Sequence, residues 1–542
     1  MIRGHLIYCL LWLLVCCTAD AGAQYNIKSF DLNPFGNSNP GGYYIYNGKL
    51  FFSAFDNVNG NEPWLTDISG NTMQMLADIN PGTAASNCRN YYELNGKLFF
   101  AATDGVYGDE PRVTDGTYSS TKLLKDIQKN GNSSASAFAA MNGLLYFVAE
   151  DSISPYNNIY VTDGTDTGTR RITNNDVYRI SSTLVPFNNK LYYTKQTTAS
   201  GSRIYSSTGI PGDTMKSLAG IPLNGLGYVS TPWVYNNSLC FITADSISTK
   251  LWKSDGTEAG STILKEIQQH KYAFPTSYIF NYNFNNYTFF TAFDSTYGTE
   301  LWVSDGTDTG THVLYDINPG ISHTNISSPV VFKNKLYFKT SYTGNNSTIW
   351  ATDGTTAGTY KAIDLGSINT NAAPSFFCIY NNSLYFIAAD ENDIRCLYFS
   401  DGTQAGTKKA VPPPSLGKDI PCTNIFPFDT VLAIATGFNT KNIELHFLSS
   451  TSGSYTITPT ISRNNHVSTI YPNPAHHNFT IKTTEAFKQG SITITDIAGH
   501  VVKTERLTSN TQTISLNGIA TGVYRAEVLL DDMRSVEKLV IN

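Results

Sequence analysis

Three short segments of this sequence place carboxylates where they could bind a ligand or a metal ion. They are DNVNGNE (56–62), DGVYGDE (104–110) and DSTYGTE (294–300), and all three have the pattern D-x-x-x-G-x-E. Converging carboxylates, amides and carbonyls are the ligands that Ca²⁺ prefers. The acidic and aromatic residues of these segments are our candidates for a ligand-binding face: Asp56, Glu62, Asp104, Tyr107, Glu110, Asp294, Tyr297 and Glu300.

A structural interpretation of the same segments competes with ligand binding. In that interpretation Asp starts a turn, Gly bends it, and Glu is solvated at the start of the next strand. The pattern occurs in three of the nine repeated units described below, and none of the three segments matches the EF-hand loop. We therefore expect no cofactor and keep calcium at Asp56, Asp104 and Asp294 as the alternative.

Motifs of known catalytic machinery are missing from the sequence. It contains no H-E-x-x-H, no G-x-S-x-G and no P-loop. Histidines outside the N-terminal segment fill no repeated position. The sequence therefore favours a binding protein over an enzyme, although residues from different repeats could still assemble an acid–base pair.

The elements that position these segments recur along the chain. ELWVSDGT at Glu300 belongs to a series whose Asp position falls at 67, 115, 163, 208 (a Thr), 255, 305, 353 and 401, a period of about 48 residues. An Asn-Gly or Asn-Asn pair, as at Asn47, keeps the same period, and a strand-like run follows it. Each unit is predicted to form four short strands, because Asn-Gly and Asp-Gly tolerate the positive φ angles of tight turns.

The predicted fold class is all-β, a β-propeller of about eight to nine four-stranded blades, because four antiparallel strands per unit are typical of propeller blades. The run at Ile27 resembles the fourth strands of the units, so we expect it to complete the last blade. The Asp-Gly-Thr stretch is predicted to be a structural turn. Trp302 and its counterparts are expected in the core between blades. The D-x-x-x-G-x-E loops belong on the face opposite that turn.

The two ends of the chain differ from the repeats. Arg3, an apolar run and Ala21-Gly22-Ala23 predict a signal peptide over residues 1–23, with a lipoprotein anchor at Cys16 or Cys17 as the alternative. The propeller is expected over 24–455, a linker over 456–466, and a small Ig-like β-sandwich over 467–542. No later segment is long and apolar enough to span a membrane. A net charge of -6 argues against nucleic acid as a partner.

Five cysteines follow the predicted signal peptide: Cys88, Cys240, Cys378, Cys396 and Cys422. An odd number without a C-x-x-C pair indicates neither a disulfide framework nor a zinc site. We expect small buried residues, with Cys378 and Cys396 as the best candidate disulfide.

The repeats resemble the ELWxxDGT repeats of secreted and surface proteins from the Bacteroidetes, a resemblance that implies no defined activity. The C-terminal segment resembles the type A sorting domain of the type IX secretion system. The matching positions are Tyr471, Pro472, Asn473 and Pro474 in the opening motif, Asp496 and Gly499 in the central turn, and Gly522, Tyr524 and Lys538 near the end. The resemblance implies passage through the periplasm, the type IX translocon and sorting machinery as partners, and a secreted or outer-membrane surface location.

The expected function is an exported binding scaffold for a glycan or protein ligand. One alternative is a carbohydrate-active hydrolase or lyase whose site lies on the same loop face. Another is a structural surface protein.

Overall fold

The computed structural model describes residues 25–542 except 34–35, 130, 174–179, 181–182, 198–200, 212–215, 219–226, 246–247, 270–279, 343–344, 412–419, 438–441, 451–467, 484–486, 488, 496–500 and 531–532. The predicted signal peptide and linker lie outside these residues. The chain divides into two compact units, Met1–Ile457 and Thr458–Asn542.

Nine antiparallel sheets form among the described residues of the first unit. Sheets 1 to 3 consist of β2 (Gly41–Tyr46), β3 (Lys49–Asp56), β4 (Gly60–Thr66) and β5 (Gln74–Met75); β6 (Arg89–Leu94), β7 (Lys97–Thr103), β8 (Asp109–Thr114) and β9 (Lys122–Leu123); and β10 (Ser136–Met141), β11 (Leu144–Asp151), β12 (Ser154–Thr162) and β13 (Arg170–Arg171). A short 3₁₀ turn, η1 (Tyr118–Ser120), lies between β8 and β9.

Sheets 4 to 6 consist of β14 (Val185–Phe187), β15 (Lys190–Thr197), β16 (Gly201–Ser207) and β17 (Lys216–Ser217); β18 (Tyr228–Val229), β19 (Trp233–Tyr235), β20 (Ser238–Ala244), β21 (Ser248–Ser254) and β22 (Thr262–Gln269); and β23 (Asn281–Phe284), β24 (Tyr287–Asp294), β25 (Gly298–Ser304) and β26 (His312–Tyr315). Sheets 7 and 8 consist of β27 (Asn325–Phe332), β28 (Lys335–Tyr342), β29 (Asn345–Thr352) and β30 (Tyr360–Asp364); and β31 (Ser375–Tyr380), β32 (Ser383–Ala389), β33 (Arg395–Ser400) and β34 (Lys408–Lys409).

Sheet 9 combines both ends of the first unit. It contains β35 (Cys422–Phe428), β36 (Val431–Thr436) and β37 (Glu444–Ser450), and its fourth strand is β1 (Tyr25–Phe30). β1 pairs antiparallel with β37, from Tyr25 opposite Ser450 to Phe30 opposite Leu445. The expectation that the N-terminal run completes the last sheet is confirmed.

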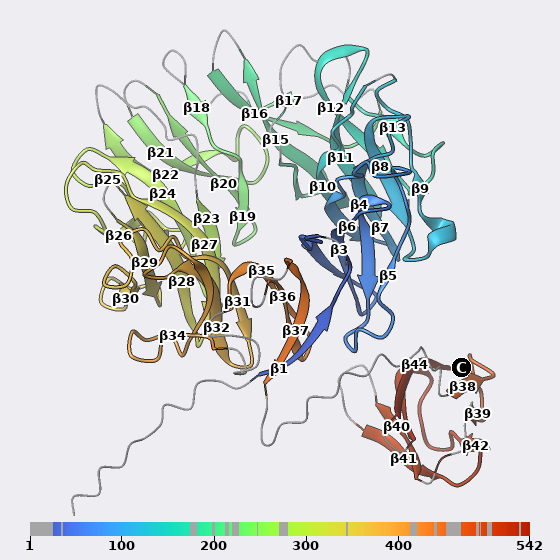
Figure 1. The fold of residues 1–542 in the computed structure, drawn as a ribbon. Coiled ribbons are helices and arrows are strands. Elements are labelled where there is room, and N and C mark those ends of the chain that lie inside the picture. Colours follow the sequence, from blue (N-terminus) through green and yellow to red (C-terminus); the bar gives the residue numbers. More distant parts are fainter. Residues whose placement is uncertain are drawn as a thin grey trace, which may run out of the picture. The chain divides into compact units, whose positions relative to one another are not determined.

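The sheets follow one another around a common centre in chain order, a propeller-like arrangement (Figure 1). The first strands of neighbouring sheets contact each other, as β6 contacts β2 and β10, and β2 also contacts β35 of sheet 9. The first strand of each sheet therefore lies innermost. Successive connections alternate between two faces. We call the face with the turns after the first and third strands the turn face, and the face with the loops after the second and fourth strands the loop face.

The repeated turns have the backbone geometry that their residue types predict. Asn47 and Gly48, between β2 and β3, have φ angles of 50° and 69°. Gly306, after β25, has a φ of 89°. Asn and Gly adopt such left-handed conformations at low cost, so the period of the turns in the sequence becomes the period of the sheets.

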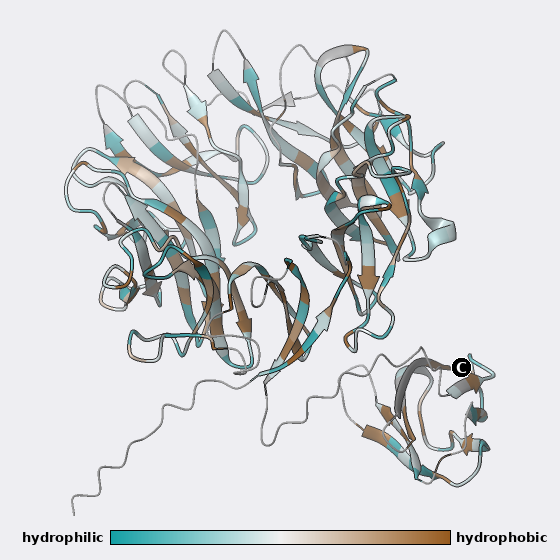
Figure 2. Ribbon diagram, viewed as in Figure 1, coloured by the Kyte–Doolittle hydropathy of each residue, from teal (hydrophilic) through white to brown (hydrophobic). Residues whose placement is uncertain are grey.

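The apolar core lies between neighbouring sheets. Trp302 on β25 is 5% exposed and packs in one cluster with Trp233, Cys240 and Leu251 of sheet 5. Tyr160 of sheet 3 packs in the same way with Ala101 of sheet 2. Hydrophobic stretches lie along many of the strands (Figure 2), and β7 and β25 are buried over most of their length, because both faces of these strands pack against neighbouring sheets. The predicted position of the third-strand aromatics is confirmed.

The suggested disulfide between Cys378 and Cys396 is wrong. All five cysteines after the predicted signal peptide are free and buried. Cys378 lies on β31 and Cys396 on β33, and β32 separates these two strands. Strands two apart in a sheet are about 9–10 Å apart, beyond the Cα separation of about 4.4–6.8 Å that a disulfide allows.

The second unit consists of two antiparallel sheets over one core. One sheet contains β38 (Ser468–Tyr471), β39 (Asn478–Thr483) and β42 (Thr511–Ser515). The other contains β41 (Val501–Leu507), β40 (Gly490–Thr495), β43 (Gly522–Leu530) and β44 (Met533–Ile541). Phe479 and Ile481 of the first sheet share a buried cluster with Ile492 and Val528 of the second. Among the described residues of the chain, no helix is long and apolar enough to cross a membrane.

Candidate functional site

The aspartate of each D-x-x-x-G-x-E segment caps its own loop. Oδ1 of Asp56 accepts hydrogen bonds from the amides of Val58 and Asn59 at 2.8 and 2.6 Å. Oδ1 of Asp104 accepts from Val106 and Tyr107 at 2.9 and 2.7 Å, and Oδ1 of Asp294 accepts from Thr296 and Tyr297 at 2.7 and 3.3 Å. Such side-chain-to-backbone bonds fix a turn, and the three loops therefore share one conformation.

Asp104 has a further partner. The Arg112 guanidinium donates to Oδ2 of Asp104 at 2.6 Å, from the position where other sheets carry a third-strand aromatic ring. Burial alone would raise the pKa of Asp104, but the amides of Tyr107 and Val106 and the Arg112 charge outweigh it, so the pKa is lowered. Asp104 is therefore held as an anion in a structural ion pair.

The glycine of each segment allows two loops to touch. Gly60, Gly108 and Gly298 have φ angles of 76°, 79° and 73°. A Cβ atom at Gly108 would lie 2.0 Å from the carbonyl oxygen of Gly131, and one at Gly298 would lie 2.0 Å from that of Ser322. These carbonyls belong to the loop that leaves the fourth strand of the same sheet. Glycine is required here because any side chain would push the two loops apart.

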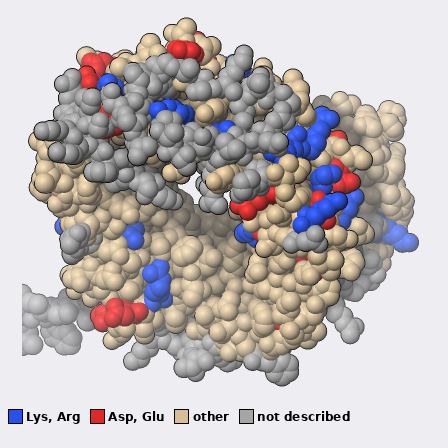
Figure 3. Space-filling view, turned by 90° about the horizontal axis from the view of Figure 1, so that it is seen from above, with Lys and Arg blue, Asp and Glu red and all other residues tan. Residues whose placement is uncertain are grey.

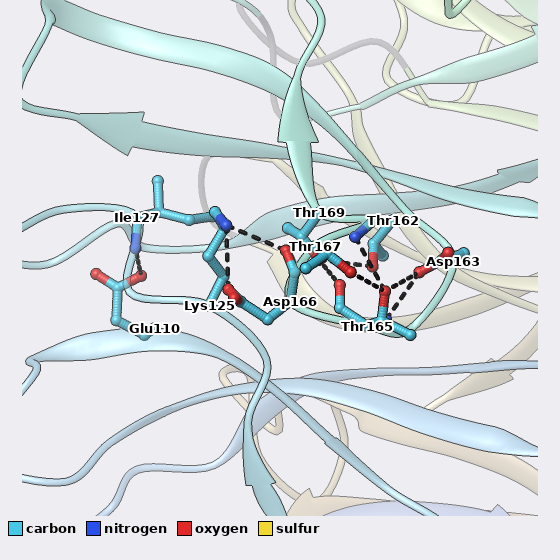
Figure 4. A network of polar contacts seen from close by, with 10 residues as sticks. Glu110, Lys125, Ile127, Thr162, Asp163, Thr165, Asp166, Thr167 and Thr169 are labelled. Carbon is cyan, nitrogen blue, oxygen red and sulfur yellow. Dashed lines mark hydrogen bonds and ion pairs between the residues drawn. The ribbon is translucent and has the colours of Figure 1, made fainter.

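The glutamates lie beneath the loop face and not on it. Glu62, Glu110 and Glu300 are fully buried, at 0% exposure each. Glu110 accepts hydrogen bonds from the amides of Ile127, Gln128 and Ser133 at 3.0, 3.1 and 3.2 Å, and Figure 4 shows the bond from Ile127. Neither the ligand hypothesis nor the alternative of a solvated glutamate anticipates this role, which is to hold the loop after the fourth strand.

The other two glutamates make the same contacts. Glu62 accepts from the amides of Ile79 and Ser86 at 2.8 and 3.1 Å. Glu300 accepts from the amides of Ile317 and Asn318 at 3.1 and 3.2 Å and from Oγ1 of Thr324 at 2.6 Å. We call these three residues, with Glu444 described next, the clamp glutamates.

Glu444 of sheet 9 is a fourth clamp glutamate that the sequence pattern missed. Its carboxylate accepts from the amides of Leu32 and Ser38 at 3.0 and 3.2 Å and from Oγ of Ser38 at 2.6 Å. The loop that it holds follows β1, so the clamp here joins residues from opposite ends of the first unit. The Glu-Leu pair in IELHFLSS, which repeats the Glu-Leu of ELWVSDGT, was the available sequence indication.

Burial changes the acidity of the clamp glutamates. Desolvation raises the pKa of Glu62, Glu110 and Glu300 to about 7, although the hydrogen bonds that each carboxylate accepts lower it. A nearby aspartate in the clamped loop raises each pKa further: Asp78, Asp126 and Asp316. In each of these three aspartates a buried Oδ1 accepts no hydrogen bond from the described residues.

The described residues contain no group of three or more His, Cys, Asp and Glu side chains that could hold a metal ion. Asp56, Asp104 and Asp294 lie on three different sheets, so the structure does not bring these candidates together. Calcium binding therefore remains a hypothesis for each of the three loops separately. In each loop, a calcium ion would have to compete for Oδ1 of the aspartate with the backbone amides that already donate to it.

The Asp-Gly-Thr stretch forms a self-contained turn on the turn face. Oδ1 of Asp163 accepts from the amide and hydroxyl of Thr165 at 2.9 and 2.7 Å, and the Gly164 amide donates to Oγ1 of Thr162 at 2.9 Å. Lys125 of sheet 2 donates to Oδ1 of Asp166 in this turn at 3.0 Å (Figure 4). The turn therefore helps to join neighbouring sheets, which supports the structural interpretation.

The loop face presents apolar side chains at the tips of the capped loops. Val58, Val106 and Ile153 are 72%, 78% and 70% exposed, and they occupy the same position of the loop in sheets 1, 2 and 3. Oδ1 of Asp151 accepts from the Ile153 amide at 3.0 Å, so sheet 3 has a related but shorter capped turn, in which Asp151 pairs with Ser154. Tyr107, beside Val106, is 45% exposed, whereas Tyr297 is half-buried.

The opening motif of the C-terminal segment contacts the last strand. Oδ1 of Asn473 accepts from the Val540 amide at 2.9 Å, and the Ala475 amide donates to the Val540 carbonyl at 2.8 Å. Tyr471 is 47% exposed, and Pro472 and Pro474 lie in the same loop. Residues that are far apart in the sequence pattern are thus adjacent in the fold.

Other motif positions are distributed over the same unit. Gly522 begins β43, and the Tyr524 hydroxyl donates to the Ala520 carbonyl at 2.8 Å. Lys538 lies on β44 opposite Arg525. Asp496 and Gly499 lie outside the described residues.

Residues 469–542 match the family of the secretion system C-terminal sorting domain. The chain therefore carries a sorting domain that marks it for export to the cell surface or for secretion, and this domain implies interaction with the secretion machinery. None of the curated proteins matches the chain significantly.

Similar solved structures share little sequence with this chain. A prolyl endopeptidase has a TM-score of 0.39 and 11% identity, with 67% of this chain and 54% of that chain covered, so this chain spans about half of its length. A puromycin hydrolase has a TM-score of 0.35 and 10% identity, with 65% and 58% covered. PorZ, a surface component of the type-IX secretion system of Porphyromonas gingivalis, has a TM-score of 0.21 and 12% identity, with 92% and 80% covered. Similarity at this level carries no argument about function.

Proposed function

We propose that this protein is a binding scaffold that the type IX secretion system delivers to the cell surface, and that its loop face binds a glycan or protein ligand. The observation that carries the proposal is the set of exposed apolar tips, Val58, Val106 and Ile153, held on capped turns in three consecutive sheets. Exposed apolar side chains that recur on one face of neighbouring sheets are candidates for an interaction surface.

The clamp glutamates support a rigid binding face. Each one fixes a loop by two or three hydrogen bonds from beneath, as Glu110 fixes the loop at Ile127 and Ser133. A loop that is ordered before binding loses little conformational entropy when a ligand arrives. Tyr107 adds an aromatic side chain that could stack on a sugar ring or pack on a peptide.

We also infer the finer architecture. The nine sheets form a closed nine-bladed propeller built from ELWxxDGT-type repeats, with β1 as the strand that closes the ring, and the second unit is an Ig-like sandwich. Pairing of β1 with β37 and the contact of β2 with β35 support closure.

A glycan array and a polysaccharide-degradation screen on the full-length mature protein test the proposed activity. Binding without turnover is expected, and the triple variant Val58→Ser, Val106→Ser, Ile153→Ser should lose it. Ile263→Ser on β22, 47% exposed on an outer strand, is the matched control and should bind normally. Release of products would indicate a hydrolase or lyase instead, and silence in both screens would indicate a structural surface protein.

Export by the proposed route has its own test. Deleting residues 467–542 should leave a folded, signal-processed first unit in the periplasm, because the second unit has a separate core. Fusing 467–542 to a reporter with a signal peptide should carry the reporter to the surface of a host that has this secretion system. Fractionation with surface proteolysis measures both. A truncated chain that still reaches the surface would contradict the route.

A further inference from the structure

The loop face of sheet 6 carries a contact between two ring side chains. Phe293 lies near the end of β24, and His323 lies in the loop between β26 and β27. Their ring centroids are 5.8 Å apart, with an angle of 45° between the two ring planes. Phe293 is half-buried and His323 is exposed, so part of this ring surface is open to solvent.

A hydrogen bond fixes the imidazole of His323. Its Nδ1 atom shares a hydrogen bond with Oγ1 of Thr299 on β25, and the two atoms are 2.8 Å apart. Nε2 of His323 forms no hydrogen bond with the residues that the structure describes. If Thr299 donates this bond, Nε2 of the neutral ring is a donor, and if Nδ1 donates it, Nε2 is an acceptor. A hydroxyl group of a ligand suits both cases, because it can donate and accept.

Holding the loop does not by itself require an imidazole. The contact of the motif glycine with a loop carbonyl aligns three sheets, and the residue after that carbonyl is Ala85 in sheet 1, Asn132 in sheet 2 and His323 in sheet 6. Oδ1 of Asn132 accepts from the Asp109 amide at 2.8 Å, so a small amide braces the loop of sheet 2. Ala85 has no polar side chain, yet the loop of sheet 1 keeps the bonds to its clamp glutamate. The ring at His323 therefore exceeds what the loop needs.

Both loops beside the ring pair are ordered by other contacts. Asp294 caps the first loop, and Glu300 holds the second from beneath. The Ser295 amide donates to Oε1 of Gln268 on β22, and Nε2 of Gln268 donates to the Ser295 hydroxyl. A ligand at the ring pair therefore meets loops that are already ordered, which lowers the entropic cost of binding.

The exposed residues beside the ring pair carry no fixed charge. Thr296 and Ser322 offer hydroxyl groups, and Ile321 offers apolar surface at 72% exposure. Only 15% of the residues of the chain are charged, and Figure 3 shows large areas of the described surface without Lys, Arg, Asp or Glu. A neutral sugar ring has the complementary chemistry, because its C–H groups pack on aromatic rings and its hydroxyl groups bond to polar side chains.

We propose that Phe293 and His323 form a subsite for one sugar ring of a neutral glycan, which we call the sheet-6 subsite. The C–H groups of the sugar pack against the two side-chain rings, and one of its hydroxyl groups bonds to Nε2 of His323. This inference rests on the proposed function of the loop face and narrows its ligand to a glycan.

Neutral tetrasaccharides of glucose, galactose and mannose are the probes for the full-length mature protein, and tetragalacturonate is their anionic counterpart. In isothermal titration calorimetry, a neutral tetrasaccharide should bind more tightly than tetragalacturonate. A bound neutral tetrasaccharide should also protect His323 from modification by diethyl pyrocarbonate, read by mass spectrometry. His312, an exposed residue of β26 beside the turn face, is the internal control and should react equally with and without the sugar.

Two variants of His323 separate sugar binding from loop structure. His323→Ala should weaken the neutral tetrasaccharide by about tenfold, because it removes a ring contact and a hydrogen bond. His323→Asn introduces the residue that braces the loop of sheet 2, so it should melt like the unmodified protein and still bind the sugar more weakly. His312→Ala is the matched control and should bind normally.

Each contrary result has a distinct meaning. Full affinity of both His323 variants, or no protection of His323 by a bound tetrasaccharide, would overturn the subsite. If the His323 variants bind normally and the triple variant Val58→Ser, Val106→Ser, Ile153→Ser does not, the loop face remains the binding face and only the subsite is rejected. Tighter binding of tetragalacturonate than of every neutral probe would reject a neutral ligand. Silence of the whole glycan array would reject the subsite together with any glycan ligand of the loop face.

Discussion

Replacing Glu110 by Ala is predicted to release the loop between β9 and β10. The carboxylate of Glu110 is fully buried and accepts hydrogen bonds from the amides of Ile127, Gln128 and Ser133. Alanine supplies no acceptor for these three amides. The loss should therefore appear as local opening of this loop as well as a lower global stability.

The magnitude follows from the three amides. An unsatisfied buried polar group costs about 1–3 kcal/mol, so three cost at most about 9 kcal/mol. Removing the carboxylate recovers part of this, because burial of its charge is itself unfavourable, as a pKa raised to about 7 indicates. We expect a net loss of about 3–5 kcal/mol in the free energy of unfolding. Glu110→Gln keeps one acceptor oxygen and should lose about 1–3 kcal/mol.

Urea denaturation and hydrogen exchange measure the two effects. The free energy of unfolding should fall in the order unmodified protein, Glu110→Gln, Glu110→Ala, and exchange should accelerate at Ile127, Gln128 and Ser133. Glu391→Ala, at an exposed residue of another loop on the same face, is the control and should change the stability by less than about 0.5 kcal/mol. If Glu110→Ala unfolds like this control and the three amides exchange at their original rates, the clamp has no energetic role.

Three further predictions concern pH, backbone strain and calcium. Folding raises the pKa of Glu110 from 4.5 to about 7, so the folded state binds this proton more tightly than the unfolded state does. The contribution of the protonated clamp glutamates to the free energy of unfolding should therefore be fully present below pH 4.5 and be lost as the pH rises through 7. The triple variant Glu62→Gln, Glu110→Gln, Glu300→Gln is the reference for this measurement. Gly298→Ala should lower the free energy of unfolding by more than about 2 kcal/mol, and clearly by more than Gly306→Ala does. The reason is that a Cβ atom at Gly298 would lie 2.0 Å from the Ser322 carbonyl oxygen, whereas one at Gly306 has its nearest contact at 3.5 Å. Equal melting temperatures of the two variants would contradict the loop contact. Millimolar calcium should leave the melting temperature unchanged if the loop aspartates act only as caps, whereas a rise that is lost in the triple Asn variant of Asp56, Asp104 and Asp294 would establish a calcium site.

The periodic turns show what the sequence could predict. Asn-Gly and Asp-Gly pairs determine local backbone geometry by themselves, because their φ preferences do not depend on distant residues. Their spacing therefore predicted the strand order and the two faces. It also predicted that the run at Ile27 completes the last sheet, since its residues resemble the fourth strands. The sorting domain could likewise be identified from the sequence, because its motif residues form a specific combination.

The roles of the buried groups were decided by tertiary structure. Glu110 and Asp104 are equally polar in the sequence, but one lies beneath the loops and the other caps a turn, because the loop after the fourth strand folds over the glutamate. Cys378 and Cys396 are 18 positions apart, yet an intervening strand separates them. Backbone conformational preferences depend on neighbouring residues and can be read from the sequence, whereas the burial of a side chain depends on which distant segments cover it.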